Sequence, residues 1–298
     1  MAGKNKSKGA SGFFLLNADF WSHTFFKVLI AALVVAGGWM CIEIARNHAI
    51  KLSDFQVSPS NLKILSKPSW VHGPIEKQVA VIPAKEERIS LLDRKATEKV
   101  ADDLRANPWV KDVKSVVRQF PDRIRAKVEL RQPAAYVLRN GKYYIVDSTG
   151  YRVPGEYSSP SEPGLDLLLI VYVRSMPPAE GAVWDDPAVV EGAKVAAFLS
   201  KYDDVVKAAK ISAIDTSNIG GRRTPREPEI TLITVDQTKI FWGRGIDTPI
   251  AKELRPESKI ANLKAVIARE GELTEKEYVD IRFQNPVFRD RKYYLGAL

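Results

Sequence analysis

The hydrophobic pattern of the chain begins with one long apolar run. Val28 to Ile42 contains no charged residue, and extending the run back over Phe25 and Phe26 adds only Lys27 as an interruption. As an α-helix, this stretch spans about 27 Å, close to the roughly 30 Å hydrocarbon core of a bilayer. We therefore predict a membrane-spanning helix over residues 25–45.

The residues around this run favour a retained anchor over a cleaved signal peptide. Lysines dominate the leading segment, which predicts a cytoplasmic tail over residues 1–24. A signal peptide would need small residues at a cleavage site, and Trp39-Met40-Cys41-Ile42 offers none. Residues 46–75 contain Pro59, Pro68 and Pro74 and predict a linker to a body outside the cytoplasm.

The first part of the body predicts a small unit of strands and one helix. KQVAVI at residues 77–82 predicts a short strand that ends at Pro83. Ala96, Val100 and Leu104 recur every four residues and predict a helix over 94–106. Alternating apolar and polar residues predict strands over 110–117 and 124–130.

The second part predicts more strands, with two amphipathic helices. Asn140-Gly141 is a two-residue hairpin turn between strands 135–139 and 142–146. Further strands are predicted over 165–173, 211–214, 230–235, 239–243 and 278–283, and helices over 187–206 and 258–269. The predicted fold class is α+β: one N-terminal transmembrane helix, a small domain, then a mixed β-sheet domain with flanking helices.

Composition limits the chemistry that the body can perform. The chain has one Cys and three His, and neither type occurs from Gly73 to Leu298. That stretch cannot hold a Ser-His-Asp triad, a Cys-His pair or a His-ligated zinc ion. Carboxylates, Lys and Ser remain as possible catalytic groups, but a membrane-anchored chain of this composition favours a binding scaffold over an enzyme. We predict no enzyme activity, no catalytic residue, no cofactor and no bound metal.

Lys and Arg exceed Asp and Glu by nine, but most of these charges are interspersed. The one dense basic group, Gly220 to Arg226, contains Gly and Pro and predicts a solvated loop. An anionic membrane surface is the functional alternative for this loop. No aromatic-interleaved basic patch is present, so we expect no nucleic-acid partner.

Two groups of short motifs follow one another along the body. The first group is Asn107-Pro108-Trp109-Val110, then Val116 to Asp122 (VVRQFPD), Val128 to Ala135 (VELRQPAA) and Ile145 to Gly150 (IVDSTG). The second group is Phe241-Trp242-Gly243-Arg244, then Lys259 to Leu263 (KIANL) and Tyr278 to Phe283 (YVDIRF). In their order and spacing, these motifs resemble the FtsQ/DivIB family of bacterial cell-division proteins.

This resemblance implies a fold and a domain organisation. It implies a POTRA domain over residues 76–134, a β domain over 135–290 and a tail over 291–298. It also implies a non-catalytic, membrane-anchored divisome scaffold at the division septum of the cell (inner) membrane. The implied partners are bitopic division proteins of the FtsB/DivIC and FtsL types and the septal peptidoglycan synthase of the FtsW and FtsI types.

Partner binding in such a scaffold is expected to use strand addition, since an unpaired strand edge offers a row of N–H and C=O groups. The family's contact lies on and just beyond the last conserved strand. By position, the resemblance implies Phe283, Asn285 and Phe288 as partner-binding residues, with the two aromatic rings as anchors. Pro286 removes one donor, so an added strand would end or bulge there.

Two other functions stay open at this point. An extracytoplasmic glycan hydrolase would need paired carboxylates, and the acidic doublets at 86–87, 102–103, 185–186 and 203–204 are the candidates. Adjacent residues point in different directions on a helix or strand, which favours solvated charge instead. A POTRA-containing factor in outer-membrane protein assembly or secretion would usually carry several such domains or a membrane barrel.

Overall fold

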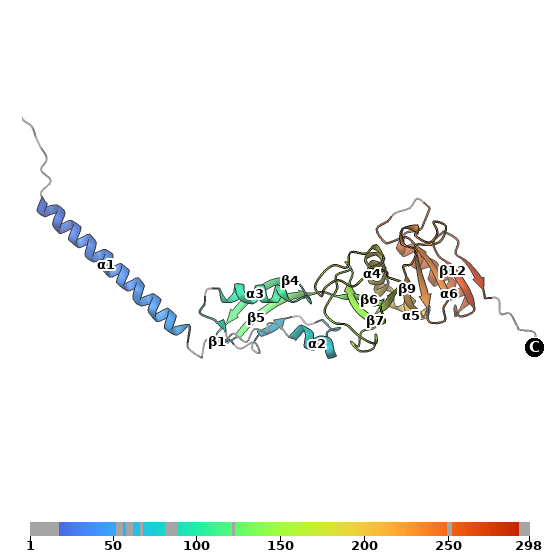
Figure 1. Ribbon diagram of the computed structural model, residues 1–298, viewed down its shortest axis with the longest axis horizontal. Coiled ribbons are helices and arrows are strands. Elements are labelled where there is room, and N and C mark those ends of the chain that lie inside the picture. The colour runs from blue at the N-terminus through green and yellow to red at the C-terminus, as the bar shows by residue number, and fades with distance from the viewer. Residues whose placement is uncertain are drawn as a thin grey trace, which may run out of the picture.

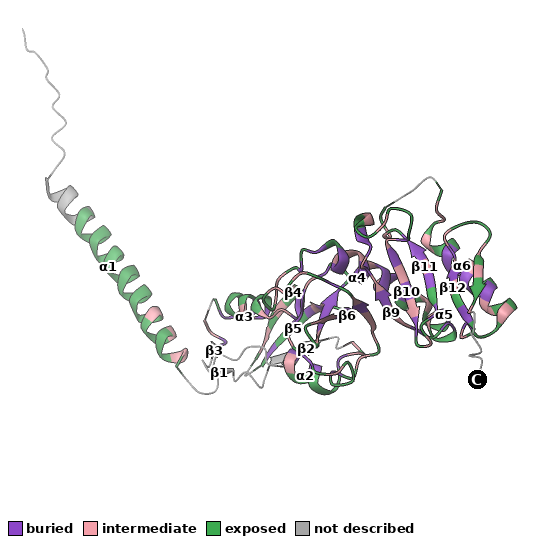
Figure 2. Cartoon of the chain, turned by 45° about the vertical axis from the view of Figure 1, so that its right-hand side comes forward, coloured by how far each residue is buried: buried purple, intermediate pink, exposed green. Residues whose placement is uncertain are grey.

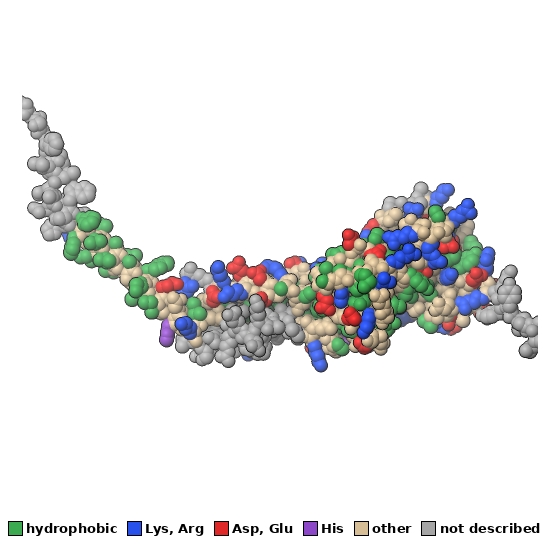
Figure 3. Space-filling view, viewed as in Figure 1, with side chains coloured by type: hydrophobic (Ala, Val, Ile, Leu, Met, Phe, Trp, Pro, Cys, Tyr) green, Lys and Arg blue, Asp and Glu red, His purple; other side chains and the backbone are tan. Residues whose placement is uncertain are grey.

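The computed structural model describes residues 18–51, 56–57, 62–65, 68–80, 89–93, 95–120, 123–248 and 252–291. Its first element is a long helix, α1 (Ala18–Ala49). Within it, Phe25–Ala49 is the one described helical span that is apolar and long enough to cross a membrane. Hydrophobic side chains cover most of the Phe25–Ala49 span, and α1 stands apart from the folded body (Figures 1 and 3). The predicted membrane-spanning helix is therefore present as a helix with an apolar surface.

The body begins with a three-stranded sheet. Its order is β2 (Leu62–Leu65), β5 (Arg123–Leu130) and β4 (Val110–Gln119), with β2 parallel and β4 antiparallel to β5. Helices α2 (Gly73–Ala80) and α3 (Ala96–Ala106) belong to the same unit. A two-residue ladder joins β1 (Gln56–Val57) to β3 (Ile89–Ser90).

The structure corrects two sequence predictions in this unit. The predicted strand over 77–82 is helical through residue 80, and residues 81–82 lie outside the described range. Val71, Ile75 and Val79 are buried at a spacing of four, which is a helical pattern, and Pro74 occupies a position near the helix start that suits proline. The predicted linker over 46–75 contains β2, so the folded unit extends N-terminal to residue 76.

The helix and hairpin predicted next are confirmed, with small changes at their ends. In β5, Ile124, Ala126 and Val128 are buried while the residues between them are exposed or half-buried. Val100 and Leu104 of α3 pack into the same core, which also holds Trp109. The alternation in β5 and the spacing of four residues in α3 therefore mark the faces of these two elements that pack against the same core.

A larger mixed sheet forms the rest of the body. Its order is β13-β12-β11-β10-β9-β8-β6-β7, with parallel pairs β6–β8, β8–β9 and β11–β12. The strands are β6 (Pro133–Arg139), β7 (Lys142–Asp147), β8 (Leu168–Val171), β9 (Ile211–Asp215), β10 (Ile230–Thr234), β11 (Lys239–Gly243), β12 (Lys276–Asp280) and β13 (Val287–Asp290). The buried strands of this sheet are visible in Figure 2.

Helices cover one face of the larger sheet. The predicted helix over 187–206 is divided into α4 (Pro187–Leu199), a 3-10 turn (Ser200–Tyr202) and α5 (Asp203–Ala208). A second 3-10 turn spans Ile219–Gly221. The other predicted helix is α6 (Pro256–Glu270), whose Ile260, Leu263 and Val266 enter the core of this sheet.

The last predicted strand is displaced, and one further strand follows it. The prediction placed a strand over 278–283, whereas β12 ends at Asp280 and residues 281–286 connect it to β13. β13 pairs antiparallel with β12, so β12 lies inside the sheet between β11 and β13. Pro286 immediately precedes β13, a position where a missing N–H group is tolerated.

Strands β6 and β7 separate two hydrophobic cores. Ala135 and Val137 of β6 face the larger core under α4, whereas Tyr136 between them belongs to the core around Trp109. On β7, Val146 faces the larger core and Ile145 the smaller one. Because successive residues of a strand point to opposite faces, this one hairpin serves both cores.

Candidate partner-binding edge

The two edges of the larger sheet differ in their protection. At one edge, β7 is covered by the segment after it, since Tyr143 and Tyr157 exchange backbone hydrogen bonds of 2.9 and 3.0 Å. At the other edge, β13 pairs only with β12 among the described strands. β13 therefore offers backbone groups to an additional strand.

The connection between β12 and β13 is held at its carbonyl groups. The side-chain amide of Asn262 donates to the carbonyl oxygens of Ile281 (3.2 Å) and Phe283 (2.7 Å). The backbone N–H of Leu254 donates to the carbonyl oxygen of Arg282 at 2.8 Å. Three consecutive carbonyls thus have donors from α6 and the loop before it, which fixes how the chain leaves β12.

The side chain of Arg282 organises the sheet face beside this connection. Its Nε and Nη2 atoms donate to the two carboxylate oxygens of Asp280 at 2.9 and 2.7 Å. The guanidinium lies 5.7 Å from the ring centre of Phe241 and 5.0 Å from that of Phe283. This forked pairing keeps the cation over both rings, where cation–π attraction applies.

Two further rings and a cation continue this row. The Phe241 and Tyr278 rings stack with centres 4.9 Å apart and planes 10° apart. The guanidinium of Arg289 on β13 lies 5.4 Å from the Tyr278 ring centre. Phe241 is half-buried between the core residues Ile240 and Trp242, so by alternation this row lies on the face opposite the helices.

A buried ion pair supports the connection from beneath. Lys259 Nζ lies 3.0 Å from Glu253 Oε2, and both side chains are largely buried. Burial lowers the pKa of Lys259, and the hydrogen bond to Glu253 opposes that shift. Gly243 has φ +98°, and a Cβ there would overlap the Glu253 carboxylate. Trp242-Gly243 and Lys259, which belong to the second motif group, therefore all pack around the Glu253 carboxylate and its ion pair.

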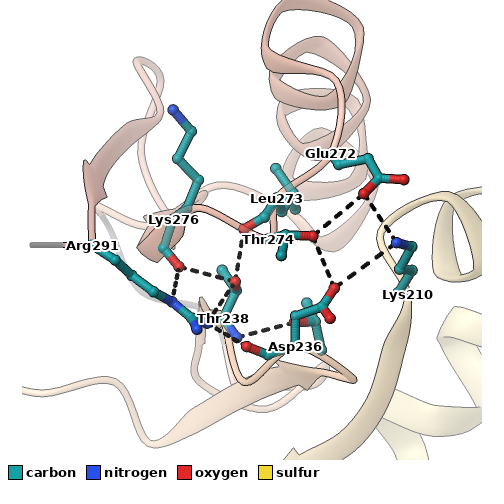
Figure 4. Close-up of polar contacts among 9 residues, drawn as sticks. Lys210, Asp236, Thr238, Glu272, Leu273, Thr274, Lys276 and Arg291 are labelled. Atoms are coloured by element: carbon teal, nitrogen blue, oxygen red, sulfur yellow. Dashed lines mark hydrogen bonds and ion pairs between the residues drawn. The ribbon is translucent and has the colours of Figure 1, made fainter. Parts of the chain in front are cut away.

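Arg291 ties the far end of β13 to the rest of the sheet (Figure 4). Its Nε donates to the carbonyl oxygen of Lys276 at 3.1 Å, and its Nη2 contacts Thr238 Oγ1 at 3.3 Å and also donates to the carbonyl oxygen of Asp236. Thr238 is fully buried, and its hydroxyl lies 2.7 Å from the carbonyl oxygen of Leu273. One arginine therefore joins β13 to the β10–β11 turn and to the start of β12.

Salt bridges hold the same end of the hairpin. Lys276 Nζ lies 2.9 Å from Glu270 Oε2 and 2.7 Å from Asp290 Oδ1. The hydrogen bonds to Asp290 and then to Glu270 raise the pKa of Lys276. In the same arrangement, the Lys276 ammonium and then Arg269 lower the pKa of Glu270.

The three predicted partner-binding residues occupy different environments. Phe283 is 42% exposed on the β12–β13 connection. Asn285 is exposed on that connection, and its side chain forms no hydrogen bond with a described residue. Phe288 lies on β13, packs partly against the larger core, and has Lys276 Nζ 4.2 Å from its ring centre.

Sequence reasoning missed the residues that position this edge. Arg291 and Thr238 are separated by more than fifty residues in the chain, and no local pattern connects them. Val287, 57% exposed on β13, is a further candidate contact residue. The sequence signal that could have predicted β13 is the short run Val287-Phe288-Arg289, which follows Pro286.

The acidic doublets considered for glycan hydrolysis have other partners in the structure, and 86–87 lies outside the described residues. Asp186 caps α4 by accepting the amide of Ala188 at 2.9 Å. The remaining ion pairs are Asp102–Arg105, Asp203–Lys207 and Asp204–Lys264, at 2.7, 2.7 and 3.1 Å.

The fold and its edge define a class of protein: an α+β body behind an apolar helix that fits single-pass membrane anchoring. The chain is similar to the cell division protein FtsQ of Chloroflexus aurantiacus, with 31% identity over 124 residues. That alignment covers 42% of this chain and 43% of the relative's length. No family model matches the chain. The similarity supports the resemblance to the FtsQ/DivIB family that the motifs indicate.

Proposed function

We propose that this chain is a membrane-anchored, non-catalytic cell-division protein of the FtsQ/DivIB type that captures a partner by strand addition to β13. The observation that carries the proposal is the edge itself. β13 pairs on one side only among the described strands, and Arg291 fixes it at one end. An edge that is already ordered loses little conformational entropy when a partner strand adds to it.

The side chains near β13 suit a partner strand with apolar and acidic residues. Phe283 and Val287 are exposed beside the edge and offer apolar contacts. Arg289 is exposed on β13, so a carboxylate of a partner strand would meet a basic group there. The proposed partners are bitopic proteins of the FtsB/DivIC and FtsL types, and through them the septal synthase of the FtsW and FtsI types.

The remaining features of the proposal concern location and domain limits. We propose that α1 anchors the chain in the inner membrane and that the body lies outside the cytoplasm, at the division septum. We propose a POTRA-type unit that extends from β2 to residue 134, N-terminal to the expected start at residue 76, followed by a β domain that ends with β13. The β6–β7 hairpin contributes side chains to both hydrophobic cores, so the two proposed domains are packed together at the 134–135 boundary.

The test is affinity purification of the tagged full-length protein from gently solubilised membranes, followed by mass spectrometry. Phe283→Asp and Val287→Asp should each reduce recovery of the small division proteins, because a charge then opposes apolar burial. Tyr172→Asp is the matched control, since Tyr172 is exposed at the end of β8, five strands from β13 in the sheet order.

The possible outcomes separate the functions. Recovery of division proteins by the parent and by Tyr172→Asp, with loss in both edge variants, supports the scaffold and its contact strand. Equal recovery by all four proteins rejects the edge as the binding site. Recovery of outer-membrane assembly factors instead of division proteins rejects the cell-division function itself.

A further inference from the structure

The turn end of the β4–β5 hairpin combines exposed apolar and basic side chains. Val117 and Phe120 are each 57% exposed and belong to the large hydrophobic side chains that the body leaves on its surface. Val117 lies directly opposite Arg125, and Gln119 lies opposite Arg123, in the register of the two strands. An aromatic ring flanked by arginines is typical of groups that settle at a bilayer interface.

The charge at this end of the hairpin is positive. Residues 117–125 contain three arginines and one acidic residue. Arg125 is exposed and forms no ion pair with a described residue. A net positive surface therefore remains for an anionic partner.

The chain path brings this end of the unit close to the membrane anchor. Leu62, the first residue of β2, pairs with Ile124, the second residue of β5. Residues 50–61 lie between α1 and this point, and so short a segment reaches at most about 40 Å. Figure 1 shows the turn end of β4 and β5 on the side of the unit nearer to α1.

We propose that the β4–β5 turn end, made of Val117, Phe120, Arg123 and Arg125, docks on the anionic bilayer in which α1 is embedded. The arginines approach lipid phosphates while the Phe120 ring enters the headgroup region. The basic loop Gly220–Arg226 connects β9 to β10, and β9 lies on the side of the body away from α1 in Figure 1, so this loop does not serve the role. This inference rests on the membrane anchoring of the proposed function and is independent of strand capture.

The experiment uses the full-length protein in nanodiscs, with Cys41→Ser and one new cysteine for a fluorescent label. A label at Gln119→Cys reports on the turn end, and a label at Ser200→Cys reports on the larger sheet. If Gln119→Cys does not fold, Ser115→Cys on β4 takes its place. Quenching by lipids with spin-labelled headgroups measures contact with the bilayer surface. Association of the protein with the discs verifies the anchor separately.

Docking predicts strong quenching at residue 119 and weak quenching at residue 200 in discs of anionic lipid. Arg123→Gln/Arg125→Gln should lower the ratio of docked to undocked molecules roughly 30-fold. High salt should lower the same ratio by less, because it screens only the electrostatic attraction. Arg222→Gln/Arg226→Gln removes the same charge from the distal basic loop and should change nothing. Phe120→Ser should weaken docking even where the charge is kept.

Two results would overturn the proposal. Equal quenching at residues 119 and 200 would show that the turn end has no preferred contact with the bilayer. The second result is quenching at residue 119 that equals the parent's value in anionic discs both when the lipid is zwitterionic and when Arg123→Gln/Arg125→Gln is used. It would show that the short connection to α1 alone brings the turn end near the bilayer. Neither result bears on partner capture at β13, which the purification experiment tests.

Discussion

At the residue scale, the motif residues of the C-terminal half are best explained by one buried polar contact. Lys259 neutralises Glu253 beneath the β12–β13 connection, and Gly243 leaves room for the carboxylate. Lys259 Nζ also lies 5.2 Å from the Trp242 ring centre. These residues lie at the end of β11, in the loop after it and in α6, and each fits its neighbour's size or charge.

This arrangement predicts an asymmetric response to mutation. Glu253→Gln should lower the free energy of unfolding by about 3–5 kcal/mol, because it leaves the Lys259 ammonium buried without its countercharge. Glu253→Gln/Lys259→Met should recover part of that loss, since the buried charge is then removed. Denaturant unfolding of the full-length protein in micelles provides the measurement.

Glu257→Gln is the control for this pair, because Glu257 is exposed in the first turn of α6. It should change stability only slightly. A double variant less stable than Glu253→Gln alone would contradict the assigned role of the ion pair.

At the element scale, β13 depends on side-chain contacts more than on its own length. It has four residues, and its pairing with β12 includes a register shift between Lys276 and Tyr278. Such a short strand needs additional attachment to remain on the sheet. Arg291, Lys276 and the partly buried Phe288 provide it.

Removing the arginine attachment should release the strand locally. Arg291→Ala deletes a charged donor to two backbone carbonyls, so amide exchange in β13 should accelerate roughly 10- to 100-fold. Arg289→Ala on the same strand removes only an exposed cation–π contact and serves as the control. Hydrogen-exchange mass spectrometry would detect the difference; equal rates in both variants would exclude Arg291 as the main attachment.

The salt bridge to Glu270 should make the hairpin sensitive to acid. The pKa of Glu270 lies below its ordinary value of 4.5, so its contribution to stability is present above pH 4.5 and disappears as pH falls through the lowered pKa. Glu270→Gln should therefore melt at a lower temperature than the parent at neutral pH. The difference should vanish in acid. A melting deficit that does not shrink as the pH is lowered into the acid range would contradict this assignment.

The elements themselves were predictable where periodicity was strong. The alternation of β5 and the spacing of Val100 and Leu104 in α3 predicted both correctly. The prediction over residues 77–82 was wrong because the apolar run in KQVAVI is too short to distinguish a strand from the end of a helix. β13 was missed because its contacts are long-range, and so was the polar node around Thr238 and Arg291.

At the scale of the whole molecule, the shared β6–β7 hairpin makes the body mechanically continuous. Trp109 Nε1 donates to Gln78 Oε1, and Gln78 Nε2 donates to the Tyr157 hydroxyl, both at 3.2 Å. Burial raises the pKa of that hydroxyl. Arg131 and Asp147 add an ion pair of 2.9 Å across the same junction. The membrane-proximal unit and the larger sheet therefore meet through packed side chains as well as through the chain.

This continuity predicts that the two parts unfold together. Trp109→Ala in the smaller core should lower the free energy of unfolding by about 3–5 kcal/mol, and Leu263→Ala in the larger core by about 2–5 kcal/mol. Each should shift one common transition in calorimetry of the full-length protein, because Tyr136 and Ile145 transmit the loss across the hairpin. Two separate transitions, each responding to one variant, would show that the parts are independent. A common transition would mean that the unit around Trp109 and the β13 edge keep a fixed separation, because the two cores then unfold as one body.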